Sequence, residues 1–311
     1  MNEWAKSKDE AAQRERQRLA KRIVPVKKML VDSMKPIHSS PIDLSKFIKE
    51  AKKRFKSVTI EQGIRILLGC NVVQGIKEIE DRISTQGFSF RDLIATTKID
   101  RDGRIKCIVP AVADAKGDDH IAVLYHEAEE YSSLVADMQL LRLLMIMKKC
   151  FSIDEASLDF LVNENAFVPE DRKTSFLKGL VAGFNLDFIT AMSILMPQIE
   201  NAIRCLAENC GAVVYKTKEN GIEECLGLNS VLNLPELKEC LDENFIFHLN
   251  AFFNSEYGFN MRNDVCHGLL TDAELQSSRS IAVWWFVLYL CCLFSPEFHL
   301  RIEQQNKSQK T

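Results

Sequence analysis

The amino-acid sequence predicts a mainly α-helical protein, with a C-terminal helical bundle and a largely helical N-terminal region that contains a small β-hairpin. Three observations lead to this prediction. Apolar residues recur at helical spacing along most of the 311 residues. Hydrophobic residues make up 46% of the chain, which is enough for a large buried core. A strand pattern around an Asp-Gly turn is found only briefly, at residues 99–105.

Pattern and composition divide the chain into three parts. Residues 1–150 are expected to form a mainly helical N-terminal region with a basic arm and the short hairpin. Residues 151–298 are expected to form the helical bundle. Residues 299–311 are polar and are expected to be a disordered tail.

Helix signals in the first half come from caps, prolines and apolar spacing. Pro25 is expected to break the first helix, and Ser40 is expected to be the N-cap of the second. Thr59 and Gln62 have the spacing of a capping box. We expect helices over residues 3–34, from residue 41, over 60–83 and over about 120–149.

The second half has a more regular helical pattern. Pro197 lies inside one expected helix and should kink it just before Glu200. Asn220-Gly221 marks a tight turn, and Thr271 with Glu274 indicates a capping box that opens the last helix. We expect helices over about residues 152–165, 171–183, 186–209, 235–254, 260–269 and 272–295.

Residues 280–296 contain no charged side chain and end at Pro296. This run is at the lower limit of length for crossing a bilayer. A buried core helix is the preferred interpretation, because the bundle needs one strongly apolar helix and no second apolar segment of this kind is present. We therefore expect no membrane association.

Charge is distributed unevenly along the chain. The net charge is −3, but residues 1–60 contain 16 Lys or Arg and 7 Asp or Glu, so they carry +9 and the remainder carries −12. A basic arm can bind RNA phosphates. The alternative is a solvated helical face, and a base-stacking surface is not expected because aromatic residues are almost absent from this arm.

Cysteine and histidine usage predicts neither disulfides nor a metal site. The ten cysteines form no Cys-x-x-Cys pair, so we expect reduced thiols in a cytoplasmic protein that has no signal peptide. His126-Glu127-x-Glu129-Glu130 lacks the second histidine of a zinc protease helix and is interpreted as surface. No cofactor is expected.

The run Gly258 to Gly268 contains Arg262-Asn263-x-x-x-His267 followed by Gly268. An arginine that grips phosphate lies close to the side chain that titrates near neutral pH, and this pair suits phosphodiester chemistry without a metal. On an ideal helix Arg262 and His267 are offset by roughly 140°. Both can reach one cleft only if the helix begins near Arg262.

This run resembles the Arg-x-x-x-x-His signature of the HEPN superfamily of ribonucleases. A bacterial uncharacterised-domain family that ends in Asn-x-Arg-Asn-x-x-x-His-Gly is similar over residues 165–295, including Phe167-Val168-Pro169-Glu170, Gly179-Leu180 and Leu195 to Arg204. The resemblance implies a HEPN-like helical bundle, a symmetric homodimer and metal-independent RNA cleavage, often in toxin or phage-defence systems. Some members of the superfamily are inactive binding modules.

The candidate site residues have distinct expected roles. Arg262 holds two phosphate oxygens and His267 acts as general acid or base. Asn263 orients the phosphate or a partner residue, and Asn260 supports it. Cys266 is not expected to act as a nucleophile with His267, because adjacent residues on a helix point about 100° apart.

Glu200 and Arg204 are four residues apart, so a structural ion pair on one helix is the first interpretation. In the second interpretation, Arg204 adds a phosphate contact and Glu200 positions Arg262 or His267. One His267 per chain cannot readily serve two proton transfers, so we expect the site at a two-fold dimer interface.

The leading functional hypothesis is therefore a HEPN-type endoribonuclease, toxic when released, that acts as a toxin or as a phage-defence (antiviral) effector. Its partners are RNA, a second copy of the chain and a separate antitoxin or regulatory protein. The alternative is a non-catalytic helical adaptor that binds a nucleotide, RNA or a partner protein through the same cleft.

Overall fold

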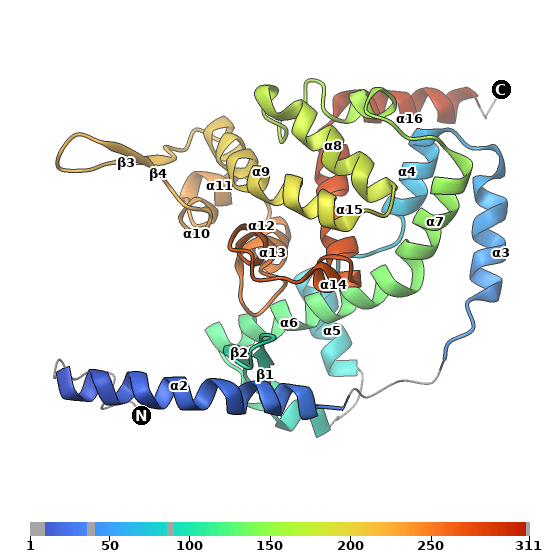
Figure 1. The fold of residues 1–311 in the computed structure, drawn as a ribbon. Helices are drawn as coiled ribbons and strands as arrows, with labels where there is room; N and C mark the ends of the chain where they lie inside the picture. Colours follow the sequence, from blue (N-terminus) through green and yellow to red (C-terminus); the bar gives the residue numbers. More distant parts are fainter. Residues whose placement is uncertain (1–9, 36–40, 86–89, 309–311) are drawn as a thin grey trace. The chain divides into compact units, whose positions relative to one another are not determined.

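The computed structural model describes residues 10–35, 41–85 and 90–308, and this part of the chain is mainly helical (Figure 1). The chain separates into two compact units, one of residues 1–42 and 88–120 and the other of residues 43–87 and 121–311. These units do not follow the boundary expected near residue 150. Each unit is described by itself below.

The first unit contains α2 (Glu10–Ser33) and a two-stranded antiparallel sheet of β1 (Thr96–Ile99) and β2 (Ile105–Val109). The expected hairpin is confirmed, and its turn uses a left-handed Gly103 with φ +72°. The expected break at Pro25 is wrong, because α2 continues through it. Proline removes one helical hydrogen bond, and a helix can bend around that loss instead of ending. The Ser40 cap lies outside the described residues.

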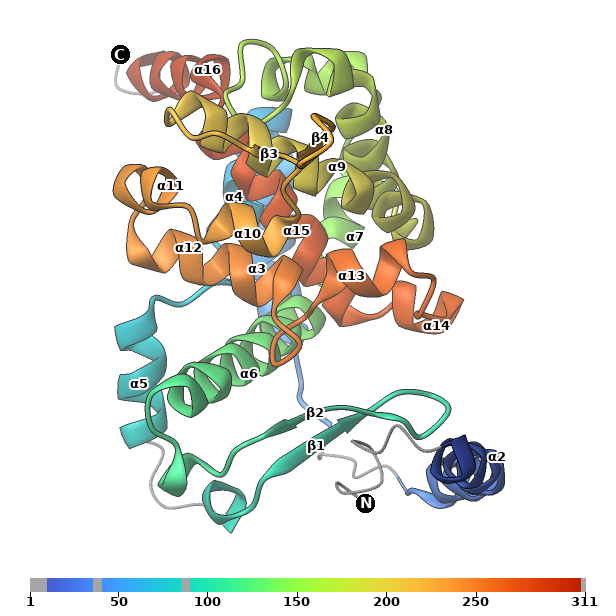
Figure 2. The same ribbon diagram turned by 90° about the vertical axis from the view of Figure 1, so that its left-hand side faces the viewer.

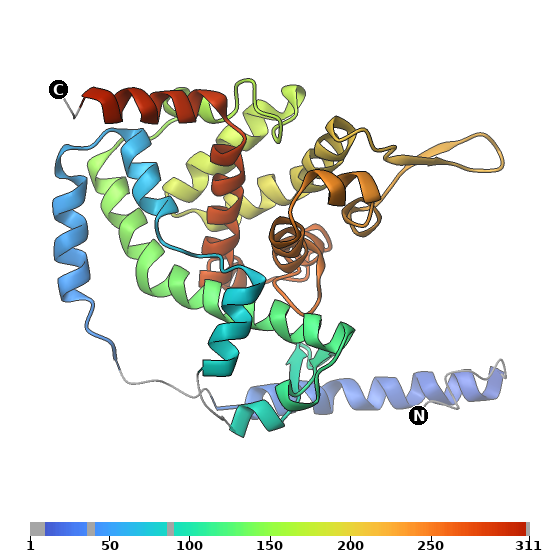
Figure 3. The ribbon, with the colours of Figure 1, turned by 180° about the vertical axis from the view of Figure 1, so that it is seen from behind.

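The second unit is a helical assembly with a small hairpin that projects from it (Figures 1 and 3). The N-terminal part supplies α3 (Ser45–Arg54), α4 (Ile60–Leu68), α5 (Ile76–Thr85), α6 (Asp118–Val135, which belongs to this unit from residue 121) and α7 (Leu141–Cys150). The middle part supplies α8 (Lys173–Phe184), α9 (Phe188–Asn209), β3 (Tyr215–Thr217) and β4 (Glu223–Cys225). The C-terminal part supplies α10 (Leu228–Leu232), α11 (Pro235–Cys240), α12 (Glu243–Leu249), α13 (Met261–Cys266), α14 (Asp272–Leu275), α15 (Ser278–Leu293) and α16 (Pro296–Ser308).

Helix α15 lies in the middle of the helices of this unit (Figure 2). Nearly all of its residues from Ser280 to Cys292 are buried, which confirms the interpretation of the uncharged run as a core helix. Trp285 donates its Nε1 hydrogen to the carbonyl of Leu67 at 2.8 Å, so the buried indole has a polar partner. Trp284 packs edge-on against Phe184 of α8, with ring centroids 4.9 Å apart. The indole rings thus join α15 to both the early and the middle helices.

Three expected helices differ from the structure for local reasons. Residues 60–83 form α4 and α5 because Asn71 adopts a left-handed φ of +48° between them. Residues 152–165 form only a short 3₁₀ helix, Ala156–Leu161, because the buried Asn165 side chain bonds to the carbonyls of Leu161 and Cys291. The capping box at Thr271 is confirmed, but it opens the short α14 and not α15.

Two other expected helices contain π-helical segments. The helix expected over 120–149 is present as α6 and α7, joined through Ala136–Leu140. The helix expected over 235–254 is divided into α11, α12 and a π-helical end at Asn250–Asn254. The helix expected over 186–209 is confirmed as α9, which continues through Pro197.

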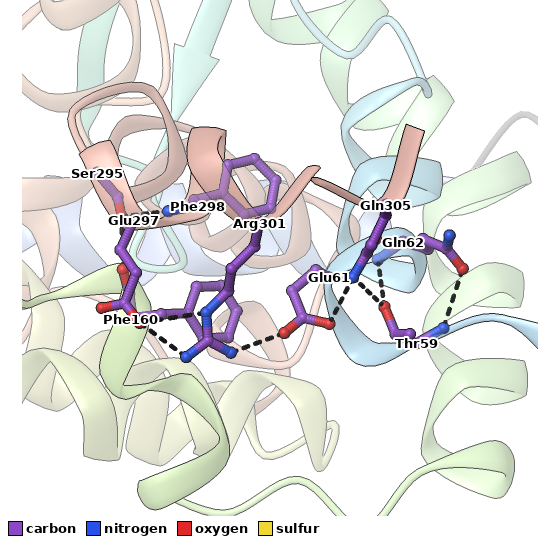
Figure 4. Close-up of polar contacts among 9 residues, drawn as sticks. All are labelled: Thr59, Glu61, Gln62, Phe160, Ser295, Glu297, Phe298, Arg301 and Gln305. Carbon is purple, nitrogen blue, oxygen red and sulfur yellow. Dashed lines mark hydrogen bonds and ion pairs between the residues drawn. The ribbon is translucent and has the colours of Figure 1, made fainter. Parts of the chain in front are cut away.

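Helix α16 replaces the disordered tail expected from residue 299, and residues 309–311 lie outside the described part. Arg301 explains the order, since its guanidinium bonds to Glu61 at 2.8 Å and to Glu297 at 2.7 Å (Figure 4). It also lies over the ring of Phe160, at 4.6 Å from the centroid. Gln305 donates to the capping hydroxyl of Thr59 at 3.0 Å, so α16 is held to the start of α4.

Over the described ranges, we find no single helix with both the length and the apolar composition to cross a membrane. Helices α15 and α16 pass that test only as a pair, and they are bent by 79° relative to each other.

Gly183 of α8 provides a test of the packing around α15. A Cβ atom at this position would overlap the Trp284 indole, which is fully buried and cannot move freely. We expect Gly183→Ala to lower the free energy of unfolding by more than about 2 kcal/mol. Gly227→Ala is the control, because a Cβ there meets open space, and it should change stability by less than about 1 kcal/mol. Urea denaturation measures both, and equal effects would contradict the packing argument.

Candidate functional site

The approach to the motif helix depends on a close backbone contact. After the π-helical segment Asn250–Asn254, the chain folds back so that Phe259 N–H donates to the carbonyl of Ala251 at 2.8 Å. Gly258 lies directly against that carbonyl, and a Cβ atom at this position would overlap it. Glycine is therefore required here for close approach.

Asn260 starts α13 in a left-handed conformation, with φ 50° and ψ 27°. Its side chain does not cap the helix but bonds to two later residues. Its Oδ1 accepts from Asn263 Nδ2 at 2.7 Å, and its Nδ2 donates to Oδ1 of the buried Asp264 at 3.3 Å. Because α13 begins at Met261, Arg262 lies in its first turn, as the spacing argument required.

The end of α13 presents His267. This residue is the C-cap, and Gly268 follows it with a left-handed φ of +64°. Leu269 N–H donates to the carbonyl of Asp264 and Gly268 N–H donates to that of Val265, which is the Schellman arrangement. A Cβ atom at Gly268 would meet open space, so this glycine does not serve a close approach between helices. Gly268 ends the helix instead.

Glu200 of α9 lies between two arginines. Its Oε1 accepts from Arg204 Nη2 at 2.8 Å, one turn further along α9. Its Oε2 forms an ion pair with Nη2 of Arg262 on α13. Glu200 is only 11% exposed, so a buried carboxylate joins the motif helix to α9. The i,i+4 pair is formed, and Glu200 also contacts Arg262, as the second interpretation expected.

Each of the three nitrogens of the Arg204 guanidinium donates a hydrogen bond within the chain. Its Nε donates to the carbonyl of Leu226 at 3.1 Å, and its Nη1 donates to Asn201 at 3.3 Å. The remaining Nη2 is bonded to Glu200. In this conformation Arg204 fixes the carboxylate of Glu200 and the chain that follows β4.

Arg262 is held at both ends of its fork. Its Nη1 donates to Asn263 Oδ1 at 2.9 Å, while its Nη2 contacts Glu200. Its Nε is buried and finds no hydrogen-bond acceptor among the described residues. A chain of amides continues from Asn263 to Asn260, so the direction of the guanidinium is set by both helices.

His267 differs from the other motif residues in being exposed. Its backbone N–H donates to the carbonyl of Asn263 at 3.0 Å, but within the described chain its imidazole forms no hydrogen bond or ion pair. The adjacent Cys266 is a poor nucleophile. Partial burial raises the pKa of its thiol, and this outweighs the opposing effect of the Arg262 charge.

The sequence did not reveal the residues that hold the segment before α13 in place. Arg279 of α15 donates to the carbonyl of Phe259 at 2.8 Å and pairs with Glu129 of α6 at 2.7 Å. Glu129 is buried, and so is Glu127, which pairs with Arg82 at 2.8 Å. The interpretation of this glutamate-rich stretch as surface is therefore wrong. No local signal indicated this, because each glutamate pairs with a cation that is distant in the sequence.

In the part of the chain that the structure describes, no group of three or more His, Cys, Asp or Glu side chains is arranged to hold a metal ion. Comparisons of the chain with protein-family models, curated proteins and solved structures find no match. The resemblance to the HEPN superfamily therefore depends on the motif and on the upstream residues named above.

The shared carboxylate can be tested by stability. We expect Glu200→Gln to lower the free energy of unfolding by about 3 kcal/mol, because two largely buried guanidiniums would lose their common anion. Glu208→Gln, on the exposed end of the same helix, should change it by less than about 0.5 kcal/mol. Urea denaturation measures the free energy of unfolding of both variants. A small change for Glu200→Gln would show that the ion pairs contribute little to stability.

Proposed function

We propose that this chain is a HEPN-type endoribonuclease that cleaves RNA without a metal ion, at a site formed by Arg262, Asn263 and His267. One observation carries the proposal. A buried carboxylate and an amide hold the Arg262 guanidinium in the first turn of α13, and the same helix ends at an exposed His267. A fixed cation and an accessible imidazole are the two groups that this chemistry needs.

The reaction proceeds by attack of the 2′-hydroxyl of RNA on the adjacent phosphorus. A base removes the 2′ proton, the 5′ oxygen leaves and takes up a proton, and the products carry a 2′,3′-cyclic phosphate and a 5′-hydroxyl. His267 moves a proton, and Arg262 stabilises the charge that develops on the non-bridging oxygens. Cys266 takes no part, because its thiol stays protonated near neutral pH.

The bonds around Arg262 leave one donor of the guanidinium unsatisfied. Its Nε–H has no acceptor among the described residues, and a ligand oxygen that reached it after local movement would satisfy it. Glu200 acts as a positioning residue, because it orients the fork and neutralises one of the two arginine charges beside it. Asn263 and Asn260 complete this support from the side of α13.

The active unit in this proposal is a two-fold dimer. A single His267 cannot readily act as both base and acid in one turnover, and its exposed position leaves it open to a second copy of the chain. Two copies would supply two histidines and two arginines to one cleft. A toxin or antiviral effector controlled by a separate antitoxin or regulatory protein is the biological role that the resemblance implies.

A non-catalytic adaptor is the second candidate, and one observation favours it. Both Nη atoms of Arg262 already have partners within the chain, which is what a purely structural arginine would show. In that case the same surface binds a nucleotide, RNA or a protein without cutting it.

Incubation of the purified protein with RNA in EDTA separates the two candidates. We expect cleavage of RNA but not of DNA, with cyclic phosphate ends detected by mass spectrometry. His267→Ala should reduce the rate by about 100-fold or more. Arg262→Lys should be nearly as damaging as Arg262→Ala, because lysine lacks the planar fork that binds two oxygens.

The matched control is His299→Ala, which removes an exposed histidine outside the motif. Its rate should equal that of the unchanged protein. Cleavage that EDTA abolishes and Mg²⁺ restores would contradict the mechanism. Absence of cleavage in all variants, with RNA still bound, would favour the adaptor.

Mixing of inactive variants tests the shared site. If each productive site takes its arginine from one copy and its histidine from the other, heterodimers of Arg262→Ala with His267→Ala regain one intact pair. We expect partial cleavage in the mixture and none in either parent alone. Full activity of a protein that remains monomeric at micromolar concentration would contradict sharing.

A further inference from the structure

Helix α2 carries an exposed apolar stripe that nothing in the proposed reaction uses. Its members follow one another at intervals of four, three and four residues, and each remains substantially open to solvent. They are Leu19 at 42%, Ile23 at 41%, Val26 at 63% and Leu30 at 58% exposed. In the described part of the chain these four side chains form an exposed aliphatic row, and the β1–β2 turn at Gly103 packs beside it, against Lys27.

The spacing of this stripe is that of a two-stranded coiled-coil seam. Intervals of four and three keep side chains within one narrow face, where they can insert between the side chains of a second helix. Pro25 lies roughly 140° away from the middle of the stripe on an ideal helix, so it does not interrupt the face. The stripe can therefore accept a helix along two heptads.

Charge excludes a second copy of α2 as the occupant. Residues Glu10–Ser33 contain seven Lys or Arg and three Asp or Glu, which gives +4. Arg22 and Lys27 flank the stripe at the positions that meet across a coiled coil, so self-pairing would oppose like charges. A partner helix with acidic residues in the flanking positions would instead form attractive pairs.

The composition of α2 separates a helical partner from the other anionic surfaces. No aromatic side chain is present over Glu10–Ser33. Single-stranded RNA is usually bound through stacking of bases on aromatic rings, which α2 lacks. A narrow a/d seam with basic flanks is the arrangement that pairs with a helix of opposite charge.

We propose that α2 is the docking site for an acidic amphipathic helix of a partner protein. The apolar stripe supplies the buried contact, and Arg22 with Lys27 selects the acidic partner. This surface does not include Arg262 or His267. The docking proposal therefore holds whether or not the chain cleaves RNA.

A direct test uses the full chain and synthetic peptides of about three heptads. One peptide has leucine at the seam and glutamate at both flanking positions, and a second replaces every glutamate by lysine. Fluorescence anisotropy with labelled peptides measures binding. We expect the acidic peptide to bind at least about tenfold more tightly than the basic one. Equal binding of both, or binding of neither, would overturn the proposal.

Matched variants of the chain locate the contact. Ile23→Ser with Leu30→Ser removes two members of the stripe and should weaken binding of the acidic peptide by about tenfold or more. Val24→Ser removes an exposed apolar residue that lies off the stripe and off its flanking positions, at 55% exposure, and should leave binding within about twofold. A loss in Val24→Ser equal to that in the double variant would contradict the assignment to the stripe.

Charge reversal and competing surfaces complete the test. Arg22→Glu with Lys27→Glu should shift the preference from the acidic to the basic peptide, which general loss of helix would not do. Vesicles of phosphatidylcholine with phosphatidylserine, and a single-stranded RNA, are measured in parallel. Stripe-dependent binding to vesicles or to RNA, stronger than binding to the acidic peptide, would overturn the proposal. So would self-association of the chain through α2 in sedimentation.

Discussion

The candidate site depends on one carboxylate, that of Glu200, which is shared between Arg204 and Arg262. A carboxylate at 11% exposure loses most of its hydration, and this loss is tolerated only when cations compensate for it. Two guanidiniums do so here, one from the same helix and one from α13. The electrostatic requirement of Glu200 therefore aligns α13 with α9, and it orients Arg262 before any ligand binds.

A second ion pair, between Arg279 and Glu129, fixes the segment that leads into α13. Arg279 is neutralised by the buried Glu129, and it donates to the carbonyl of Phe259 just before α13 begins. Gly258 allows that segment to lie against Ala251. The start of α13 is thus defined by backbone contact on one side and by charge on the other. Such support is what a phosphate-binding arginine needs, because a mobile guanidinium would lose much of its binding energy to entropy.

Local signals in the sequence were sufficient for much of the fold. The capping boxes at Thr59 and Thr271, the hairpin turn at Gly103 and the buried helix α15 follow from short-range chemistry, and the structure confirms them. The break at Asn71 was not predictable in this way, because a left-handed asparagine has no strong local signature. The order of α16 depends on Arg301 and Glu61, which are 240 residues apart.

The motif shows the same division between local and distant information. Spacing alone required a helix that starts near Arg262, and α13 starts at Met261. The partners of Glu129 and Glu127 could not be predicted from the sequence. No sequence pattern links these glutamates to Arg279 and Arg82. Two glutamates within a polar run are usually solvated, and only tertiary structure shows that these are buried.

The five-residue interval from Arg262 to His267 covers almost the whole length of α13. On a long helix Arg262 and His267 would face directions roughly 140° apart. Here the helix has six residues, His267 is its C-cap, and Gly268 turns the chain away with a positive φ. His267 therefore lies at the end of the helix, where it is exposed. An exposed group at a helix end is what the proposed two-fold site requires of this histidine.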